Sequence, residues 1–482
     1  MSLRSKGIAA MKWSSITAIT VTISQLLQFG IVSHFLGPVE YGLFGMITTI
    51  IWIFSAFGDM GFSNAIIKNQ SISNNHLSSL YVFNILVAAA IGLAIWLLTP
   101  LLAAFYGEPR LVEPIHWMAL ICFIPAIGQP FEAIFQKELR FETIAKADIL
   151  ANVTSFSVAT VGAYLGYGVY ALVWSFLANA STKALLMVVL GSRVWRPEFH
   201  FSWSDVKGYM SYGLYQTGTS ITNVLNGRLD YLILGSTLGA ESLGYYMFAS
   251  QLCQIPMQKL NPMIWQVTLP LYAKIQDQVE LLRKGYLQMI SMISYVIAPI
   301  FFGIIATAPL FVPLLFGDEW SPSILIMQIL SGVMLLQAVT NSASLLAATG
   351  RVDITFKFTV ASMAIMLPSM IVGAYLGNMI GVAISILLVR SVLFLIHYRF
   401  VIRRTLQLGV RQYARSAGEG VLCAASMAGL VLLLDRYAVL HSPALKLSLL
   451  IGLGIAIYVA AIYWTNKELL LRMIKKRSFQ ET

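Results

Sequence analysis

The sequence has 482 residues, of which 58% are hydrophobic and only 11% charged, and its mean hydropathy is +0.76. This apolar share far exceeds that of a soluble domain and predicts a polytopic membrane protein. No stretch is polar and long enough to fold outside the membrane, which argues against membrane polymerases, ligases and glycosyltransferases that carry a sizeable outer domain. The net charge of +11 is spread over many short connections, so it indicates membrane topology and contact with anionic lipid, not nucleic acid.

Apolar runs long enough to cross a bilayer recur from the N-terminus almost to the C-terminus. They predict an all-α polytopic membrane protein with fourteen transmembrane helices, the first of them an uncleaved helix and not a signal peptide. The predicted spans are 13–36, 40–66, 78–105, 112–136, 143–166, 168–191, 211–237, 242–266, 286–312, 323–348, 354–376, 379–402, 415–434 and 445–465.

Lysine and arginine residues are distributed unevenly between the two sets of connections. Connections after even-numbered spans, together with both tails, carry most of them, whereas connections after odd-numbered spans carry only Arg110, Arg436 and Lys446. The positive-inside rule then predicts that both termini lie in the cytoplasm.

Three pairs of segments match in the same order along the chain. The pairs are 36–42 (LGPVEYG) with 238–244 (LGAESLG), 105–108 with 315–318, and 140–146 with 351–357. Their offsets of 202, 210 and 211 residues indicate a duplication of one whole half.

The duplication divides the predicted helices into three groups. We expect a first lobe of six helices over 1–200, a second lobe of six over 201–405, and two final helices with a cytoplasmic tail over 406–482. Because six is even, both lobes enter the membrane from the same side. Parallel repeats of this kind occur in transporters that rock about a central site.

The helix predicted over 211–237 carries a polar stripe. With the periodicity of an α-helix, one face of this segment carries Gln216, Thr219, Ser220, Asn223, Asn226, Gly227 and Asp230. Hydrocarbon would leave these groups without hydrogen-bond partners, so the helix is expected to line a hydrated cavity. In the repeat, Gln28 corresponds to Asp230, and Gln25 and Gln28 belong to a weaker stripe on the first helix.

Four charged residues inside predicted spans are candidates for a translocation path. Arg228 and Asp230 point to different sides of a regular helix, so either Arg228 pairs with a neighbouring helix or Gly227 loosens the helix and both turn inward. A buried ion pair that fixes helix packing is the alternative to a transport role. Lys183 and Arg390 lie 207 residues apart in corresponding spans, so each half supplies one cation, although Lys183 is also close enough to the cytoplasmic side to snorkel.

Two matched cation pairs, Arg140 with Lys146 and Arg351 with Lys357, begin helices at the predicted cytoplasmic side. They are most simply interfacial charges, and a cytoplasmic gate is the alternative. No nucleotide-binding, zinc-binding or catalytic motif stands in a suitable context, so no cofactor or metal is expected. The three cysteines lie within spans and predict no disulfide.

Four segments in the second half carry a family likeness. They are 259–262 (KLNP), 269–277 (LPLYAKIQD), 312–320 (VPLLFGDEW) and 351–358 (RVDITFKF). They resemble the Wzx-type polysaccharide flippases of the colanic-acid exporter branch, within the multidrug, oligosaccharidyl-lipid and polysaccharide exporter superfamily. The resemblance runs nearly end to end.

The resemblance implies a bacterial inner-membrane flippase with two six-helix lobes in a V around a cationic cavity, plus two C-terminal helices. Its substrate would be an undecaprenyl-diphosphate-linked oligosaccharide repeat unit, moved from the cytoplasmic to the periplasmic leaflet. Partner proteins, a polymerase and chain-length or export proteins, would act afterwards.

These residues and the resemblance lead to a mechanistic hypothesis. The cations would hold the diphosphate, the glycan would occupy the hydrated cavity, and the polyprenyl tail would stay in lipid. Asp230 is the candidate to bind a coupling proton or cation.

Three other functions are compatible with a chain of this composition. A cation-coupled multidrug exporter on the same fold is the first, but the deep charges are mostly cationic and favour an anionic substrate. A membrane polysaccharide polymerase would need a large periplasmic loop, whereas the longest outer connections span about 10 to 15 residues. A structural scaffold is the third, and the polar stripe argues against it.

Overall fold

The computed structural model of the protein describes residues 3–58, 66, 73–198, 200–437 and 442–466. These residues form helices and connections and contain no strand, which confirms the all-α class. Ten of the described helical segments are long and apolar enough to cross a membrane. The predicted cytoplasmic tail after residue 466 lies outside the described residues.

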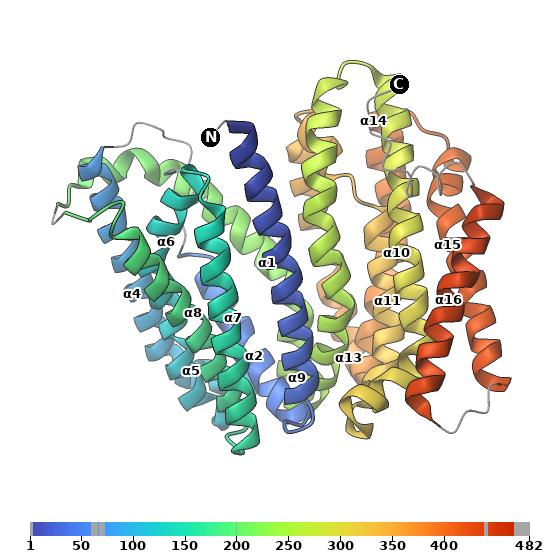
Figure 1. The fold of residues 1–482 in the computed structure, drawn as a ribbon, viewed down its shortest axis with the longest axis horizontal. Helices are drawn as coiled ribbons and strands as arrows, with labels where there is room; N and C mark the ends of the chain where they lie inside the picture. The colour runs from blue at the N-terminus through green and yellow to red at the C-terminus, as the bar shows by residue number, and fades with distance from the viewer. Residues whose placement is uncertain (1–2, 59–65, 67–72, 199, 438–441, 467–482) are drawn as a thin grey trace. The chain divides into compact units, whose positions relative to one another are not determined.

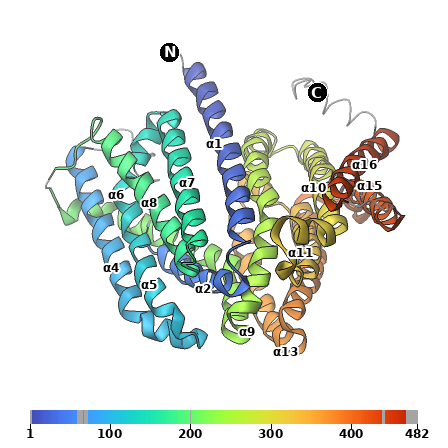
Figure 2. The same ribbon diagram turned by 60° about the horizontal axis from the view of Figure 1, so that its bottom comes forward.

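The chain divides into two compact units, residues 1–244 (unit 1) and 245–482 (unit 2). In unit 1, α1 lies along α7, and α4, α6, α7 and α8 form a neighbouring group in both views (Figures 1 and 2). The elements of unit 1 are α1 (Leu3–Val32), α2 (Pro38–Ser55), α4 (Asn74–Tyr106), η1 (Pro109–Leu111), α5 (Val112–Met118), α6 (Leu120–Lys137), α7 (Phe141–Tyr164), α8 (Val169–Gly191) and the first part of α9 (Trp203–Lys274).

In unit 2, α15 packs along both α10 and α16 (Figure 2). Besides the second part of α9, its elements are α10 (Val279–Phe316), η2 (Asp318–Trp320), α11 (Ser323–Val339), α12 (Ala343–Ala348), α13 (Val352–His397), the π-helical turn η3 (Tyr398–Ile402), α14 (Arg403–Leu406), α15 (Val410–Tyr437) and α16 (Pro443–Thr465). The boundary between the units falls within α9, and the lobe boundary expected near residue 200 stays a prediction.

Two long helices bend at positions where the sequence predicts a connection between neighbouring spans. The helix α9 has non-helical backbone at Gly239, where φ is 77° and ψ is −175°. The helix α13 has it at Gly377 and Asn378. Each bend separates two of the predicted spans.

The span predicted over 323–348 is not one continuous helix. The helix α11 ends at Val339, and α12 begins at Ala343. Between them lie Thr340, Asn341 and Ser342, a run of short polar residues of the kind that favours turns over a helix interior, and the Thr340 hydroxyl donates to the carbonyl oxygen of Leu336. The Tyr413 hydroxyl donates a hydrogen bond of 2.7 Å to the carbonyl oxygen of Val339, which gives a partner to one of the carbonyls that the helix end exposes.

The internal duplication is visible in the backbone angles. Gly168 precedes α8 with φ 55° and ψ −133°, and Asn378 stands at the corresponding bend of α13 with φ 52° and ψ −143°. Arg140 precedes α7 with φ −89° and ψ 51°, and Arg351 precedes α13 with φ −99° and ψ 42°. The two halves therefore share turn geometry at both positions, which supports the repeat.

The two copies of the first repeated segment contact each other in unit 1. A Cβ atom built on Gly42 would lie 1.7 Å from the carbonyl oxygen of Ala240, and one built on Gly244 would lie 1.8 Å from the carbonyl oxygen of Pro38. The 202-residue offset relates Pro38 to Ala240 and Gly42 to Gly244, so the contact is reciprocal. Backbones can approach this closely only where glycine removes the side chain.

Candidate functional site

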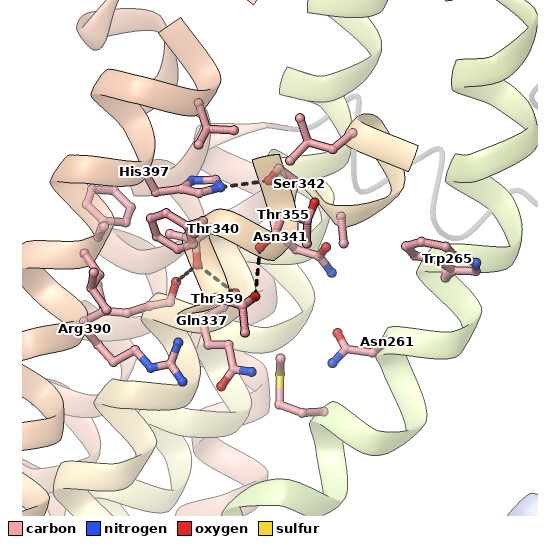
Figure 3. Close-up of a pocket in the computed structure, with 18 of the residues that line it drawn as sticks. Asn261, Trp265, Gln337, Thr340, Asn341, Ser342, Thr355, Thr359, Arg390 and His397 are labelled. Atoms are coloured by element: carbon pink, nitrogen blue, oxygen red, sulfur yellow. Dashed lines mark hydrogen bonds between the residues drawn. The ribbon is translucent and has the colours of Figure 1, made fainter. Parts of the chain in front are cut away.

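Unit 2 contains a cavity of about 510 Å³, a volume typical of ligand sites. Its walls come from the second part of α9, the end of α11, the break after it, α12, and both parts of α13 (Figure 3). Its polar lining residues are Asn261, Gln337, Thr340, Asn341, Ser342, Thr355, Thr359, Arg390 and His397.

The break between α11 and α12 brings backbone to this cavity. Thr340, Asn341 and Ser342 all line it. Irregular backbone at membrane depth is tolerated where it faces protein or a water-filled space, because its N–H and C=O groups need partners. Interrupted helices form substrate sites in many transporters for the same reason.

His397 belongs to the buried part of the polar wall, with only 6% of its surface exposed. Its Nε2 shares a hydrogen bond of 2.8 Å with the Ser342 Oγ, and the Phe358 ring packs edge-on against the imidazole. Its Nδ1 is buried and has no hydrogen-bond partner within the described part of the chain. A buried polar atom of this kind is stabilised when a ligand or water supplies the missing partner.

The remaining polar side chains fall into two groups. The hydroxyls of Thr340 and Thr359 donate to carbonyl oxygens one turn back in their own helices. The side-chain amides of Asn261, Gln337 and Asn341 form no hydrogen bond with another described residue and face the open space in Figure 3. Each amide offers both donors and an acceptor, so the cavity is equipped to bind a neutral, hydroxyl-rich ligand.

Arg390 is the predicted binding residue that lines this cavity. Its guanidinium and the Gln337 amide point toward the same space, with Asn261 on the facing wall (Figure 3). Among the described residues of the lining, Arg390 is the only lysine, arginine, aspartate or glutamate. The cavity is therefore weakly cationic, and the substrate-binding role of Arg390 stays a prediction.

Lys183 lies in a cluster of three charges in unit 1. Its Nζ is 3.1 Å from Glu132 Oε1 on α6 and 2.9 Å from Asp148 Oδ1 on α7, and the three side chains are 24 to 30% exposed. Two carboxylates against one ammonium give the cluster a net negative charge, which would repel a diphosphate. The predicted contact between Lys183 and substrate stays a prediction, and the geometry favours a role in joining three helices.

The helix α9 is regular at Gly227, because its non-helical backbone lies at Gly239. The expected loosening at Gly227 is therefore absent. The guanidinium of Arg228 lies over the ring of Tyr231, 4.9 Å from its centre, and Asp230 Oδ1 accepts a 3.0 Å hydrogen bond from the backbone N–H of Tyr231.

The other predicted stripe residues belong to unit 1. Asn223 and Gln25 are exposed, whereas Gln216 and Gln28 are half-buried. Exposed polar groups on apolar helices agree with a hydrated surface, and the binding role of these residues and of Arg228 and Asp230 stays a prediction.

The lysines of the two predicted gate pairs form similar ion pairs, and Lys146 also lies over the Trp13 ring, 5.6 Å from its centre. Lys146 Nζ lies 2.7 Å from Glu142 Oε1, and Lys357 Nζ lies 3.3 Å from Asp353 Oδ2, four positions apart in both helices. All four side chains are more than half exposed. Such pairs contribute little to stability because water screens them.

The arginine of each gate pair makes a different contact. Arg140 lies over the ring of Phe135, 4.9 Å from its centre, and 3.6 Å from Glu138. Arg351 Nη1 donates to the Thr405 hydroxyl at 3.5 Å. The contacts of Arg140 are local, whereas Arg351 contacts α14, and the gate role remains a prediction.

Replacing Lys146 or Lys357 with glutamine is expected to change the free energy of unfolding by less than about 1 kcal/mol, because each lysine forms an exposed ion pair within one helix and Lys146 adds one contact over the Trp13 ring. Titration with SDS in mixed micelles measures this, with Lys274→Gln at the exposed end of α9 as the matched control. Lost transport at unchanged stability would support the gate. Lost stability would contradict the description of these lysines as solvated.

Most of the cavity lining was not predicted. Asn261, Gln337, Asn341 and His397 each look ordinary in the sequence, because a single polar residue in an apolar helix is common. The run Thr340-Asn341-Ser342 was the available signal, since three consecutive residues of this type favour a turn over a helix.

Comparison with protein families gives one match, to a family described as polysaccharide biosynthesis protein, over residues 31–325. The chain is 33% identical over 417 residues to the lipopolysaccharide biosynthesis protein WzxC of Escherichia coli (strain K12), covering 86% of this chain and 85% of that protein. It is 21% identical over 469 residues to the succinoglycan biosynthesis transport protein ExoT of Rhizobium meliloti (strain 1021), covering 96% and 94%.

Among solved structures, the lipid II flippase MurJ in an inward closed conformation is similar, with a TM-score of 0.73 at 12% sequence identity. The match covers 96% of this chain and all of that one. At this level of identity the similarity shows a shared fold.

Proposed function

Because the chain belongs to the polysaccharide biosynthesis protein family, we propose that it is a flippase for lipid-linked oligosaccharide repeat units. The resemblance to Wzx-type exporters, first found in four segments, is confirmed by the family match and by WzxC. The observation that carries the proposal is the unit 2 cavity, where amides, hydroxyls and one guanidinium line about 510 Å³ inside an apolar helical unit.

The cavity and the outer surface suit the two ends of such a substrate. Oligosaccharide hydroxyls would exchange hydrogen bonds with Asn261, Gln337 and Asn341, while Arg390 would contact an anionic part of the headgroup. The lipid tail would stay outside, along helix surfaces that expose residues such as Leu101 (67%) and Leu376 (83%). The headgroup thus crosses in a polar space, and the tail never leaves lipid.

The membrane arrangement within this proposal has fourteen crossings. The count starts from the ten apolar helical segments and counts the one that contains α13 as two. The helix α7 and the two parts of α9 are then added. Two six-helix lobes, residues 1–200 and 201–405, would expose the site to each side of the bacterial inner membrane in turn, with both termini in the cytoplasm. The internal repeat and the biased lysine and arginine distribution support this arrangement.

The competing functions fit the described residues less well. A multidrug exporter for cationic drugs would need carboxylates in its site, and the described lining of the unit 2 cavity has none. A polymerase is an enzyme, whereas the relative ExoT is named a transport protein. A polymerase and export proteins are instead the partners that would take over the flipped unit.

Reconstitution of the purified protein into liposomes with a fluorescent lipid-linked oligosaccharide tests the proposal. The wild type is expected to move the lipid between leaflets, and the double variant Gln337→Leu with Asn341→Leu is expected to move it about tenfold more slowly, because two amide contacts to sugar hydroxyls are lost. A membrane-impermeant quencher reports the outer-leaflet fraction.

The matched control is Leu388→Ala, a change at a side chain that is 61% exposed on the same unit. It should leave the rate unchanged. No exchange above protein-free liposomes with the wild type would refute the proposed function.

A further inference from the structure

The segment of unit 2 that follows α13 carries a group of exposed arginines. They are Arg399 in the π-helical turn η3, Arg403 and Arg404 in α14, and Arg411 in the first turn of α15. We call these four residues the arginine corner. The stretch 399–411 contains no aspartate or glutamate, so four positive charges stand close together in the sequence without a local counter-charge.

The backbone that carries the arginine corner is fixed from its inner side. Tyr398 and Ile402 of η3 and Leu406 of α14 are buried in the core of unit 2. The Tyr398 hydroxyl donates a hydrogen bond of 2.8 Å to the carbonyl oxygen of Leu408, and Arg283 Nε donates one of 3.0 Å to the carbonyl oxygen of Leu406. The arginines therefore project from a segment whose opposite face is firmly packed.

Two guanidiniums of the arginine corner share one aromatic ring. The Cζ atom of Arg404 lies 5.3 Å from the centre of the Phe400 ring, and the Cζ atom of Arg399 lies 5.9 Å from it. Phe400 itself is 53% exposed. Like charges repel, so an anion that contacts both guanidiniums would offset their repulsion.

The protein itself supplies no counter-charge within the described residues. Glu419 on α15 lies 2.7 Å from Arg415, and Glu280 on α10 lies 3.0 Å from Arg283, so these carboxylates already have cationic partners. In the described part of the chain, no residue of the arginine corner forms an ion pair. The stretch 467–482 has five lysines and arginines against two glutamates and is itself basic.

Apolar side chains lead up to the arginine corner on the outer surface of the unit. Val392 and Leu395 on α13 are 53% and 64% exposed. They precede Arg399 by seven and four positions, a spacing that places all three on one helix face. Val410, next to Arg411, is 62% exposed. An apolar stripe that ends in guanidiniums matches a ligand with an acyl chain and an anionic headgroup, whereas an acidic peptide would leave the stripe uncovered.

From these features we propose that the arginine corner is a binding site for an anionic glycerophospholipid of the surrounding bilayer. The lipid phosphate would contact Arg399, Arg403 and Arg404, and an acyl chain would lie along Val392 and Leu395. Guanidiniums suit this role because their planar N–H groups bond two phosphate oxygens at once. The inference goes beyond the proposed function and does not depend on which substrate is transported.

Native mass spectrometry of the full-length protein in a neutral detergent tests the inference. The probes are phosphatidylglycerol, phosphatidylcholine with the same acyl chains, and undecaprenyl diphosphate. For the first lipid bound, the wild type is expected to prefer phosphatidylglycerol about tenfold or more, because the ammonium of phosphatidylcholine cancels the headgroup charge that the guanidiniums attract. This comparison needs no variant, so it does not depend on how a substitution folds.

Variants then assign the preference to the arginine corner. One triple variant removes three of its charges and is expected to bind both phospholipids equally: Arg399→Gln, Arg403→Gln and Arg404→Gln. Lysine at the same three positions should restore part of the preference, since the charge returns without the planar N–H groups. The matched control removes three exposed cations of unit 1 and should keep the full preference: Arg193→Gln, Arg196→Gln and Lys207→Gln.

Equal binding of the two phospholipids by the wild type would overturn the inference. The same holds if the glutamine variant of the arginine corner keeps the preference, or if the unit 1 control loses as much of it. Tighter binding of undecaprenyl diphosphate, lost in the corner variant, would assign these arginines to a lipid-linked substrate instead. Displacement of phosphatidylglycerol by an equal concentration of a hexaglutamate peptide would assign them to an acidic protein partner.

Discussion

Replacing Gly42 with alanine is expected to destabilise unit 1 by about 3 kcal/mol, near the upper end of typical overpacking costs. The new Cβ would lie 1.7 Å from the carbonyl oxygen of Ala240, and its next nearest atom, the carbonyl carbon, is at 2.5 Å. Both are backbone atoms, so no side chain can rotate away, and α2 must shift from the bend of α9. We expect Gly244→Ala to have a similar effect because its Cβ would meet Pro38 in the same way.

Unfolding by SDS titration in mixed micelles measures the loss. Gly303→Ala in α10 is the matched control, because a Cβ at Gly303 meets nothing within 4 Å. Alanine is the better helix former, so the control should be neutral or up to about 1 kcal/mol more stable. If Gly42→Ala were as stable as this control, the close contact between the two repeated segments would not exist in the folded protein.

Replacing Lys183 with alanine is expected to destabilise unit 1 by about 3 kcal/mol. The change leaves Glu132 and Asp148 near each other without the ammonium that lies 3.1 and 2.9 Å from them. All three side chains are at most 30% exposed, so water can offset only part of the repulsion. The same SDS titration measures the effect.

A neutral triple variant separates the two roles considered for Lys183. Lys183→Met, Glu132→Gln and Asp148→Asn together remove every charge of the cluster and should bring stability back close to the wild type. If flipping also returns, the lysine holds helices together and does not bind substrate. Recovered stability with lost flipping would instead support a substrate contact, and failure to recover stability would contradict the cluster's proposed packing role.

The helices and their repetition could be predicted because each leaves a local signal. Apolar runs placed the segment 168–191 within one residue of α8 (Val169–Gly191), and turn residues placed the bends near Gly239 and Gly377. Membrane helices satisfy their own backbone, so length and composition suffice to find them.

The site could be predicted only in part, because its residues meet through tertiary packing. Arg390 was found since a charge deep in a span is conspicuous, but Asn261 and Gln337 join it from α9 and α11, which are far from it in the sequence. For the same reason Lys183 was identified as a cation, but its partners, Glu132 and Asp148, were not, because they lie 51 and 35 positions earlier on α6 and α7.

The non-helical residues between α11 and α12 affect how tightly the cavity can bind its substrate. The N–H groups of Thr340 and Asn341 donate to carbonyl oxygens within the chain, whereas the side-chain amide of Asn341 faces the cavity of unit 2. In an empty cavity water would occupy the place beside this amide that a sugar hydroxyl would later take. Exchanging one hydroxyl for another releases little free energy. A transporter benefits from this small difference in free energy, because a substrate that is bound only slightly more favourably than water can dissociate on the other side of the membrane.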